Sequence, residues 1–228
     1  MSGFRYRVRW GKSGKLRFLS AHDVATVLER SVRRSKLPLA YSKGFSPHPK
    51  ISFGSALPVG YASAVELLDM TLDEHCDTTE VRDRFAASLP EGITVAAVAE
   101  VDGKAPSLGA LIEAADYELR FTDGWVDTAL EAFLGGDSYL VERKFKGSMR
   151  TDDLRPGVLA AEITDPGMSM RCALKPRGIR PSDVIAALME IAEEEILHVS
   201  YERVALLGRA SSGFVPLDER TSHLEVAA

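Results

Sequence analysis

The chain has 228 residues, of which 45% are hydrophobic, so it can form one large domain or two small ones and bury a substantial core. Its 2 cysteines lie far apart, which excludes a disulfide framework, a zinc site of several cysteines and an iron–sulfur cluster, and favours a reducing compartment. The first residues lack the apolar core of a signal peptide and no apolar run reaches membrane-spanning length, so we expect a soluble, cytoplasmic protein.

The net charge of -5 conceals a strong separation of charge along the chain. Residues 1–60 carry 12 Lys and Arg against 2 Asp and Glu, whereas residues 61–138 carry 4 and 17. A segment this basic favours a polyanionic partner that docks on one face of the protein. The alternative is that the basic and acidic segments neutralise each other across an internal interface.

Residues 4–10 alternate strictly between apolar and basic side chains, which predicts a strand with one apolar and one arginine face. The apolar face should pack on helices. Because guanidinium groups cannot be buried unpaired, we expect the arginine face to be open and to follow a phosphate backbone. Its members are Arg5, Arg7 and Arg9.

A turn at 11–14 and a short strand at 16–19 are expected next. Ser20 then resembles a helix N-cap, with Asp23 in the capping-box position, which predicts a helix over residues 21–35. Cations lie on the outer face and near the end of this helix, where they also suit the helix dipole. They are Arg30, Arg33, Arg34 and Lys36.

The stretch 37–60 contains no Asp or Glu, and Gly44, Pro47 and Pro49 keep it out of regular structure after a short strand at 39–41. Aromatic rings alternate with polar and basic groups at Tyr41, Lys43, Phe45, Ser46, His48, Lys50 and Phe53. Such a loop can hold phosphates through its cations and stack on bases through its rings. The alternative is a rigid surface connection whose rings pack inward.

The rest of the chain predicts one order of elements twice. A strand at 64–72, a helix at 79–89 and a strand at 93–101 complete a ferredoxin-like order, and a linker follows at 102–109. Further elements are expected at 117–121 (strand), 125–134 (helix), 139–145, 158–164 and 168–175 (strands), 181–191 (helix) and 196–207 (strand). The predicted fold class is α+β, with two tandem ferredoxin-like (βαββαβ) domains with antiparallel sheets at 1–104 and 110–207 and a flexible tail at 208–228.

Two stretches carry a family resemblance, KLRFLSAHD at residues 15–23 and LPLAYSKGFSPHPKISF at residues 37–53. They resemble the radical-SAM-linked domain of unknown function, in the version encoded as a separate small protein. The similarity continues more loosely through 153–156 and the turn at 178–181. The resemblance implies an accessory role beside a radical SAM enzyme, in RNA metabolism, and it supplies no catalytic residues.

The leading hypothesis is an RNA-binding accessory protein that acts beside a radical SAM enzyme or in RNA processing or modification. Its partner would be tRNA, rRNA or another structured RNA, with no DNA specificity, and we expect no metal and no cofactor. The residues predicted to contact RNA are Arg5, Arg7, Arg9, Lys12, Lys15, Arg17, Arg33, Arg34, Lys36, Tyr41, Lys43, Phe45, His48 and Lys50. A continuation across the second domain would use Arg143, Lys144, Lys146, Lys175, Arg177 and Arg180.

Two alternatives remain open. A metal-independent endoribonuclease would need a base, an acid and a cation, which His22, His48, Tyr41 and Lys50 could supply if the fold brings them together. A protein adaptor for a radical SAM enzyme, without nucleic-acid binding, would use the acidic surface between residues 66 and 131 as its contact.

Overall fold

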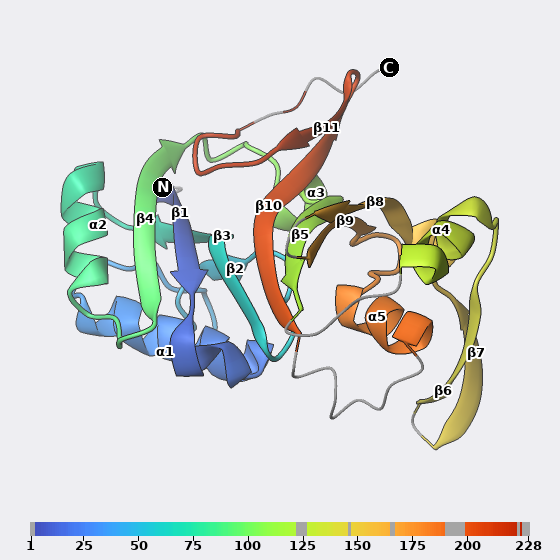
Figure 1. Cartoon of the computed structure of the whole chain (residues 1–228). Helices are drawn as coiled ribbons and strands as arrows, with labels where there is room; N and C mark the ends of the chain where they lie inside the picture. Colours follow the sequence, from blue (N-terminus) through green and yellow to red (C-terminus); the bar gives the residue numbers. More distant parts are fainter. Residues whose placement is uncertain are drawn as a thin grey trace. The chain divides into compact units, whose positions relative to one another are not determined.

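The computed structural model describes residues 3–121, 127–145, 147–164, 167–189, 199–222 and 224 (Figure 1). The chain divides into two compact units, Met1–Glu113 together with Ala205–Ala228, and Ala114–Val204. The first unit is therefore formed by two segments of the chain, one before and one after the second unit.

The first unit is a twisted antiparallel sheet with helices packed on it. Its elements are β1 (Phe4–Lys12), the 3₁₀ turn η1 (Gly14–Phe18), α1 (Ala21–Arg34), β2 (Ile51–Phe53), β3 (Tyr61–Leu72), α2 (Thr78–Ala86), β4 (Ile93–Val101), α3 (Leu108–Leu111), the second half of β10 (Ser200–Ala210) and β11 (Gly213–Pro216).

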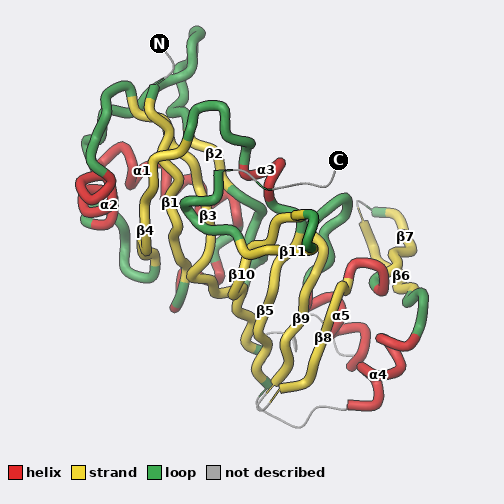
Figure 2. Tube along the Cα trace, turned by 90° about the horizontal axis from the view of Figure 1, so that it is seen from above, coloured by secondary structure: helices red, strands yellow, loops and turns green. Residues whose placement is uncertain are grey.

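Strand β1 lies between β3 and β4 and is antiparallel to both, as Figure 2 shows. Its apolar face is buried except for the exposed Phe4, and Tyr6 and Val8 belong to one core cluster with Leu28 of α1 and Phe85 of α2. Burial of these large side chains supplies most of the driving force that holds the helices on the sheet. The predicted strand and its apolar face are confirmed.

Helix α1 begins where the sequence predicts. The Ser20 side chain accepts a hydrogen bond from the backbone N–H of Asp23 at 3.2 Å, so Ser20 is the N-cap. The stripe that α1 buries contains Val24, Leu28 and Val32. The short strand expected at 16–19 is wrong, because residues 14–18 form a 3₁₀ turn.

The second unit is built on its own antiparallel strands. Its elements are β5 (Ala114–Arg120), α4 (Asp127–Gly135), β6 (Leu140–Phe145), β7 (Ser148–Asp153), the 3₁₀ turn η2 (Arg155–Gly157), β8 (Val158–Thr164), β9 (Gly167–Ala173), α5 (Pro181–Met189) and the first half of β10. Strand β9 pairs with β5 and β8, whereas β6 and β7 form a separate hairpin.

Side chains with several backbone partners connect the irregular parts of this unit. Arg155 donates to the carbonyl oxygens of Leu134 at 3.0 Å and Gly136 at 3.1 Å, which lie at the end of α4. Asp153 accepts from the backbone N–H groups of Tyr139 at 2.8 Å and Arg155 at 3.1 Å. Parts of three predicted elements lie outside the described residues, namely 125–126 of the helix at 125–134, 190–191 of the helix at 181–191, and 196–198 of the last strand.

The prediction of two tandem ferredoxin-like domains is wrong, although the fold is α+β. The strands hydrogen-bond in one large sheet of nine strands with the order β4-β1-β3-β10-β5-β9-β8, to which β2 and β11 add by pairing with β3 and β10. In two separate ferredoxin-like domains, each sheet would contain only the four strands of its own domain. The order of elements along the chain does not determine which strand edges pair, so the expected division into two small sheets had no independent support.

The predicted flexible tail from residue 208 is also wrong for the described residues. Strand β10 continues to Ala210 and β11 pairs with it. Leu217 and Glu219 are buried, each about 6% exposed.

No described helix is both long enough and apolar enough to cross a membrane. The described residues contain no group of three or more potential metal ligands.

Candidate functional site

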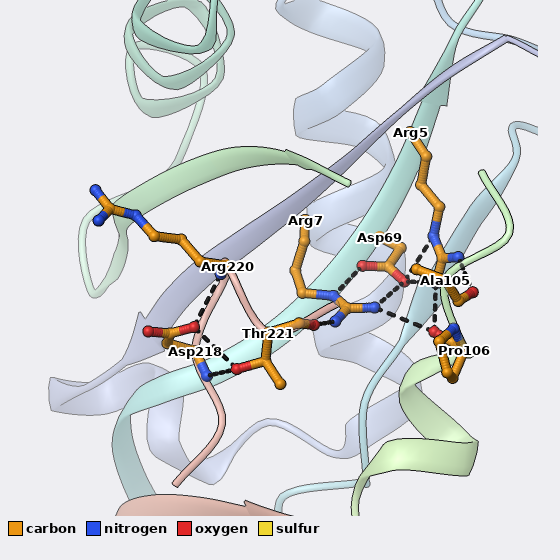
Figure 3. A network of polar contacts seen from close by, with 8 residues as sticks. All are labelled: Arg5, Arg7, Asp69, Ala105, Pro106, Asp218, Arg220 and Thr221. Carbon is orange, nitrogen blue, oxygen red and sulfur yellow. Dashed lines mark hydrogen bonds and ion pairs between the residues drawn. The ribbon is translucent and has the colours of Figure 1, made fainter. Parts of the chain in front are cut away.

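The Asp69 carboxylate lies against Arg5 and Arg7 on the arginine face of β1 (Figure 3). Arg7 is completely buried, and its guanidinium donates to the Asp69 carboxylate at 2.7 Å and 3.0 Å. Arg5 donates to the same carboxylate, with its Nε at 3.1 Å. Arg7 stands directly opposite Asp69 in the register of β1 and β3, which explains why this acid reaches it.

The C-terminal segment completes this arrangement. The carbonyl oxygen of Thr221 accepts a hydrogen bond from Arg7, and Arg9 Nε lies 3.1 Å from a carboxylate oxygen of the buried Glu219. The expectation of an open arginine face on Arg5, Arg7 and Arg9 is therefore wrong. Each of these arginines pairs with an acid of the same unit, as the alternative of internal neutralisation predicted for this strand, although the Arg9 side chain is still 37% exposed.

Lys12, Lys15 and Arg17 differ in exposure. Lys12 is buried, and its ammonium donates to the carbonyl oxygens of Arg17 at 3.2 Å and Leu19 at 3.5 Å, so it is not part of an outer cationic surface. Lys15 is exposed, and the partly exposed Arg17 guanidinium lies 4.7 Å from the centroid of the Phe18 ring. Only the last two remain accessible to a ligand in solution.

Residues 41–50 form a closed loop that projects into solvent, named here the hairpin loop. Its base is fixed by the hydrogen bond from Ser42 N–H to the His48 carbonyl at 2.8 Å and by the bridge between Tyr41 and Pro49. Thr71 of β3 anchors both sides, since its carbonyl accepts from Ala40 at 2.9 Å and its N–H donates to Lys50 at 3.0 Å. The loop is therefore held at a defined place on the sheet.

The tip of the hairpin loop presents rings and cations to water. Phe45 is fully exposed and Tyr41 is 44% exposed. Lys43, His48 and Lys50 are exposed too, and Gly44 at the tip has φ 138°, which an L side chain rarely adopts. The alternative of rings packed inward is wrong for Tyr41 and Phe45, whereas Phe53 does pack against the core cluster of the first unit. A fully exposed Phe ring gains no hydrophobic free energy on folding, and both of its faces are accessible to a ligand in solution.

The cations at the end of α1 lie just before this loop in the chain. Arg33, Arg34 and Lys36 are exposed. Arg34 also donates to the Ser88 carbonyl at 2.7 Å, so its guanidinium has a fixed position. Together with the hairpin loop they form a set of cations and rings in a part of the sequence without acids.

A cavity of about 300 Å³ opens beside the start of α1, and we call it the α1 pocket. The two stretches that carry the sequence motif meet there, because the lining contains Ala21 and His22 of the first and Phe53, the last residue of the second. The complete lining is Trp10, Lys12, Ala21, His22, Val24, Ala25, Phe53, Gly54, Ser55, Ala56, Leu57, Glu66 and Leu67. The volume is at the lower end of the range for small-molecule sites.

The predicted catalytic set is not gathered in this cavity. His22 lines the α1 pocket, whereas Tyr41, His48 and Lys50 belong to the hairpin loop and are not among its lining residues. General acid–base cleavage needs these groups within hydrogen-bond reach of one phosphate. The ribonuclease alternative remains a prediction without a geometric argument in its favour.

A second, wider cavity of about 1040 Å³ lies in the second unit and holds part of the predicted continuation of the basic surface. Arg143 and Arg180 pair with Asp183 at 2.8 Å and 2.7 Å, and Arg177 pairs with Asp152 at 2.9 Å. These acids reduce the positive charge that a phosphate would meet. The structure does not describe the side chain of Lys144 or any part of Lys146. Lys175 is only partly exposed.

Sequence reasoning missed Asp69, Glu219, Trp10 and Glu66. The register between Arg7 and Asp69 cannot be read from the sequence without knowing the strand pairing. Trp10 and Lys12 do lie on the same side of an alternating strand, which could have indicated a polar group inside the apolar face.

The family comparison supports the resemblance to a domain of unknown function, and it does not test the link to radical SAM enzymes. Residues 5–197 match the model of a family described as an uncharacterized protein conserved in bacteria, DUF2344. No curated protein sequence matches the chain.

Proposed function

The chain belongs to DUF2344, a family of uncharacterized proteins conserved in bacteria, and we propose that it is an RNA-binding accessory protein whose contact surface is the hairpin loop. The observation that carries the proposal is the fully exposed Phe45 at the tip of a loop that is anchored at its base and contains no acid. Unpaired RNA bases stack on exposed rings, while neighbouring cations hold the phosphates.

The proposed contact surface leaves out Arg5, Arg7 and Arg9 of β1, because acids of the same unit pair with them. Lys43, Lys50 and the cations at the end of α1 take their place, with Tyr41 as a second ring. The cations and rings alternate along the loop, a pattern that suits a single strand with alternating phosphates and bases. Structured RNA would be bound at its unpaired loops, bulges or ends, where bases are free to stack.

Association with a radical SAM enzyme is the second part of the proposal, and the motif resemblance at residues 15–23 and 37–53 supports it. The protein would bring RNA to that enzyme. Affinity purification of the tagged protein from its native cells, with and without ribonuclease treatment, tests this part. A radical SAM enzyme recovered in both samples supports a direct contact, and recovery of RNA alone contradicts it.

RNA binding is tested with a labelled single-stranded RNA followed by fluorescence anisotropy. Phe45→Ala should weaken binding by about 5- to 150-fold, because stacking on one ring contributes about 1–3 kcal/mol. Leu140→Ala is the matched control, since Leu140 is an exposed apolar residue of the second unit at 66% exposure. Equal affinities for wild type and Phe45→Ala would overturn the proposed contact surface.

The cations are tested in the same assay at rising salt. The logarithm of the binding constant should fall linearly with the logarithm of salt concentration, with a slope of about −0.7 for each phosphate contacted. Lys43→Gln and Lys50→Gln should each make the slope shallower, while Lys104→Gln, at another exposed lysine, should leave it unchanged. A slope near zero for the wild type would rule out phosphate contacts.

A further inference from the structure

The α1 pocket has the walls of a site for a flat ligand. The rings of Trp10 and Phe53 both line it, and the remaining walls are largely aliphatic, with Val24, Leu57 and Leu67 among them. Aromatic and aliphatic walls of this kind exclude water from the faces of a planar ring and gain free energy by burying them.

The pocket has polar groups of different kinds, with His22 and Ser55 in its lining beside three groups that are almost completely buried. Trp10 is 5% exposed, and its indole Nε1 is buried without a hydrogen-bond partner in the described part of the chain. Lys12 and Glu66 line the same pocket and are 1% and 2% exposed. Glu66 stands opposite Trp10 in the register of β1 and β3, which places these two side chains next to each other on one face of the sheet.

These groups restrict the class of ligand. A buried indole N–H without a partner is costly, so the ligand should supply an acceptor. The carboxylate of Glu66 disfavours a phosphate or another anion, and the ammonium of Lys12 disfavours a cation. A neutral ring with both donors and acceptors on its edge meets all three conditions.

We infer that the α1 pocket binds a nucleobase, with its faces against Trp10 and Phe53 and its edge toward Trp10 Nε1, Lys12 and Glu66. The inference rests on the proposed function when the base comes from RNA, and it would make the pocket the place where one unstacked base of that RNA is read. The other source of the same chemistry is a free nucleoside.

The chain connects the pocket to the hairpin loop. Phe53 follows Lys50 by three residues through β2, which at about 3.3 Å per residue is about 10 Å. A single RNA strand crosses such a distance in a few nucleotides. We therefore expect an RNA strand that contacts the base of the loop at Lys50 to be long enough to place a neighbouring base in the pocket.

Tryptophan fluorescence provides a direct assay. The chain contains 2 tryptophans, Trp10 and Trp125, so Trp125→Phe leaves Trp10 as the single reporter inside the pocket. The four free nucleosides and a short single-stranded RNA are titrated separately. We expect at least one nucleoside to quench Trp10 fluorescence saturably, with half-saturation at or below about 1 mM, which is the affinity expected of a small ligand.

Variants that fill the pocket then separate its role from that of the loop. Ala21→Leu and, independently, Ala56→Leu place a larger side chain at the exposed rim of the pocket, and Ala86→Leu makes the same change on the exposed side of α2. Circular dichroism checks that each variant is folded. Both pocket variants should abolish quenching by nucleosides and lower RNA affinity about tenfold, and Ala86→Leu should do neither.

The outcomes distinguish this inference from the proposed function. If RNA binds and depends on Phe45, but no nucleoside quenches Trp10 and both pocket variants bind RNA like the wild type, the nucleobase pocket is overturned and the RNA-binding proposal stands. If no RNA binds, the proposed function fails. Saturable quenching by a free nucleoside that is lost in the pocket variants would then still support the pocket, and its absence would overturn it.

Discussion

Replacing Asp69 by Asn tests the charge network that covers the arginine face of β1. The Asp69 carboxylate receives four N–H groups, two from Arg5 and two from Arg7. An amide of the same shape removes the negative charge and turns an N–H₂ group toward a guanidinium. Arg7 is completely buried, so it cannot recover the loss by hydration.

The magnitude follows from the partners that remain. Removing one member of a buried ion pair costs about 3–5 kcal/mol. The carbonyl oxygens of Thr221 and Ala105 still accept from Arg7 and Arg5, which places the expected loss near the lower end, at about 3 kcal/mol. For a chain of this length that corresponds to a decrease in Tm of about 6–12 °C.

Thermal and urea denaturation followed by circular dichroism measure the change. Asp83→Asn is the control, because Asp83 pairs with Arg82 at 2.9 Å on the surface, where an ion pair contributes about 0–1 kcal/mol. A loss below about 1 kcal/mol in Asp69→Asn would refute the reasoning. It would mean that the arginines are hydrated in solution and that the arginine face is open after all.

Two further predictions concern the second unit. Gly157→Ala should destabilise the protein by about 1–3 kcal/mol, since a Cβ at this position would lie 2.0 Å from Ile179 Cγ1, whereas Gly135→Ala, with nothing within 4 Å, should be neutral or slightly stabilising; urea midpoints check both. The backbone N–H of Tyr139, which donates to the Asp153 carboxylate, holds the pKa of Asp153 below its ordinary value of 3.8. The ionised form is thus favoured in the folded state, and its stabilisation is present above about pH 4 and lost as the pH falls through the lowered pKa. Asp153→Asn should therefore lose less stability than the wild type between pH 4 and pH 2, as acid titrations followed by circular dichroism would show, and an identical acid limb would contradict this assignment.

Local signals in the sequence predicted local structure well. The alternation of residues 4–10 predicted β1, and Ser20 with Asp23 predicted the start of α1, because both depend on neighbours within a few residues. The exposed loop around Phe45 was predicted for the same reason, since Pro47, Pro49 and Gly44 act on their own backbone.

Contacts between residues far apart in the sequence could not be predicted. The partner of Arg7 is Asp69, 62 residues away on a strand whose register no local pattern determines. Glu219 lies in a segment whose small and polar residues resembled a tail, yet it is buried beside Arg9. The prediction of an open arginine face considered only acids close by in the sequence, whereas Asp69 and Glu219 come from distant segments.

The most direct test of the RNA-binding proposal is the affinity of the Phe45→Ala protein for a labelled single-stranded RNA, measured beside the wild type and Leu140→Ala at one moderate salt concentration. The account predicts tight binding by the wild type and the control, and a loss of about 5- to 150-fold in Phe45→Ala without a change in Tm. Equal affinity of all three proteins, or no binding by the wild type, would contradict it.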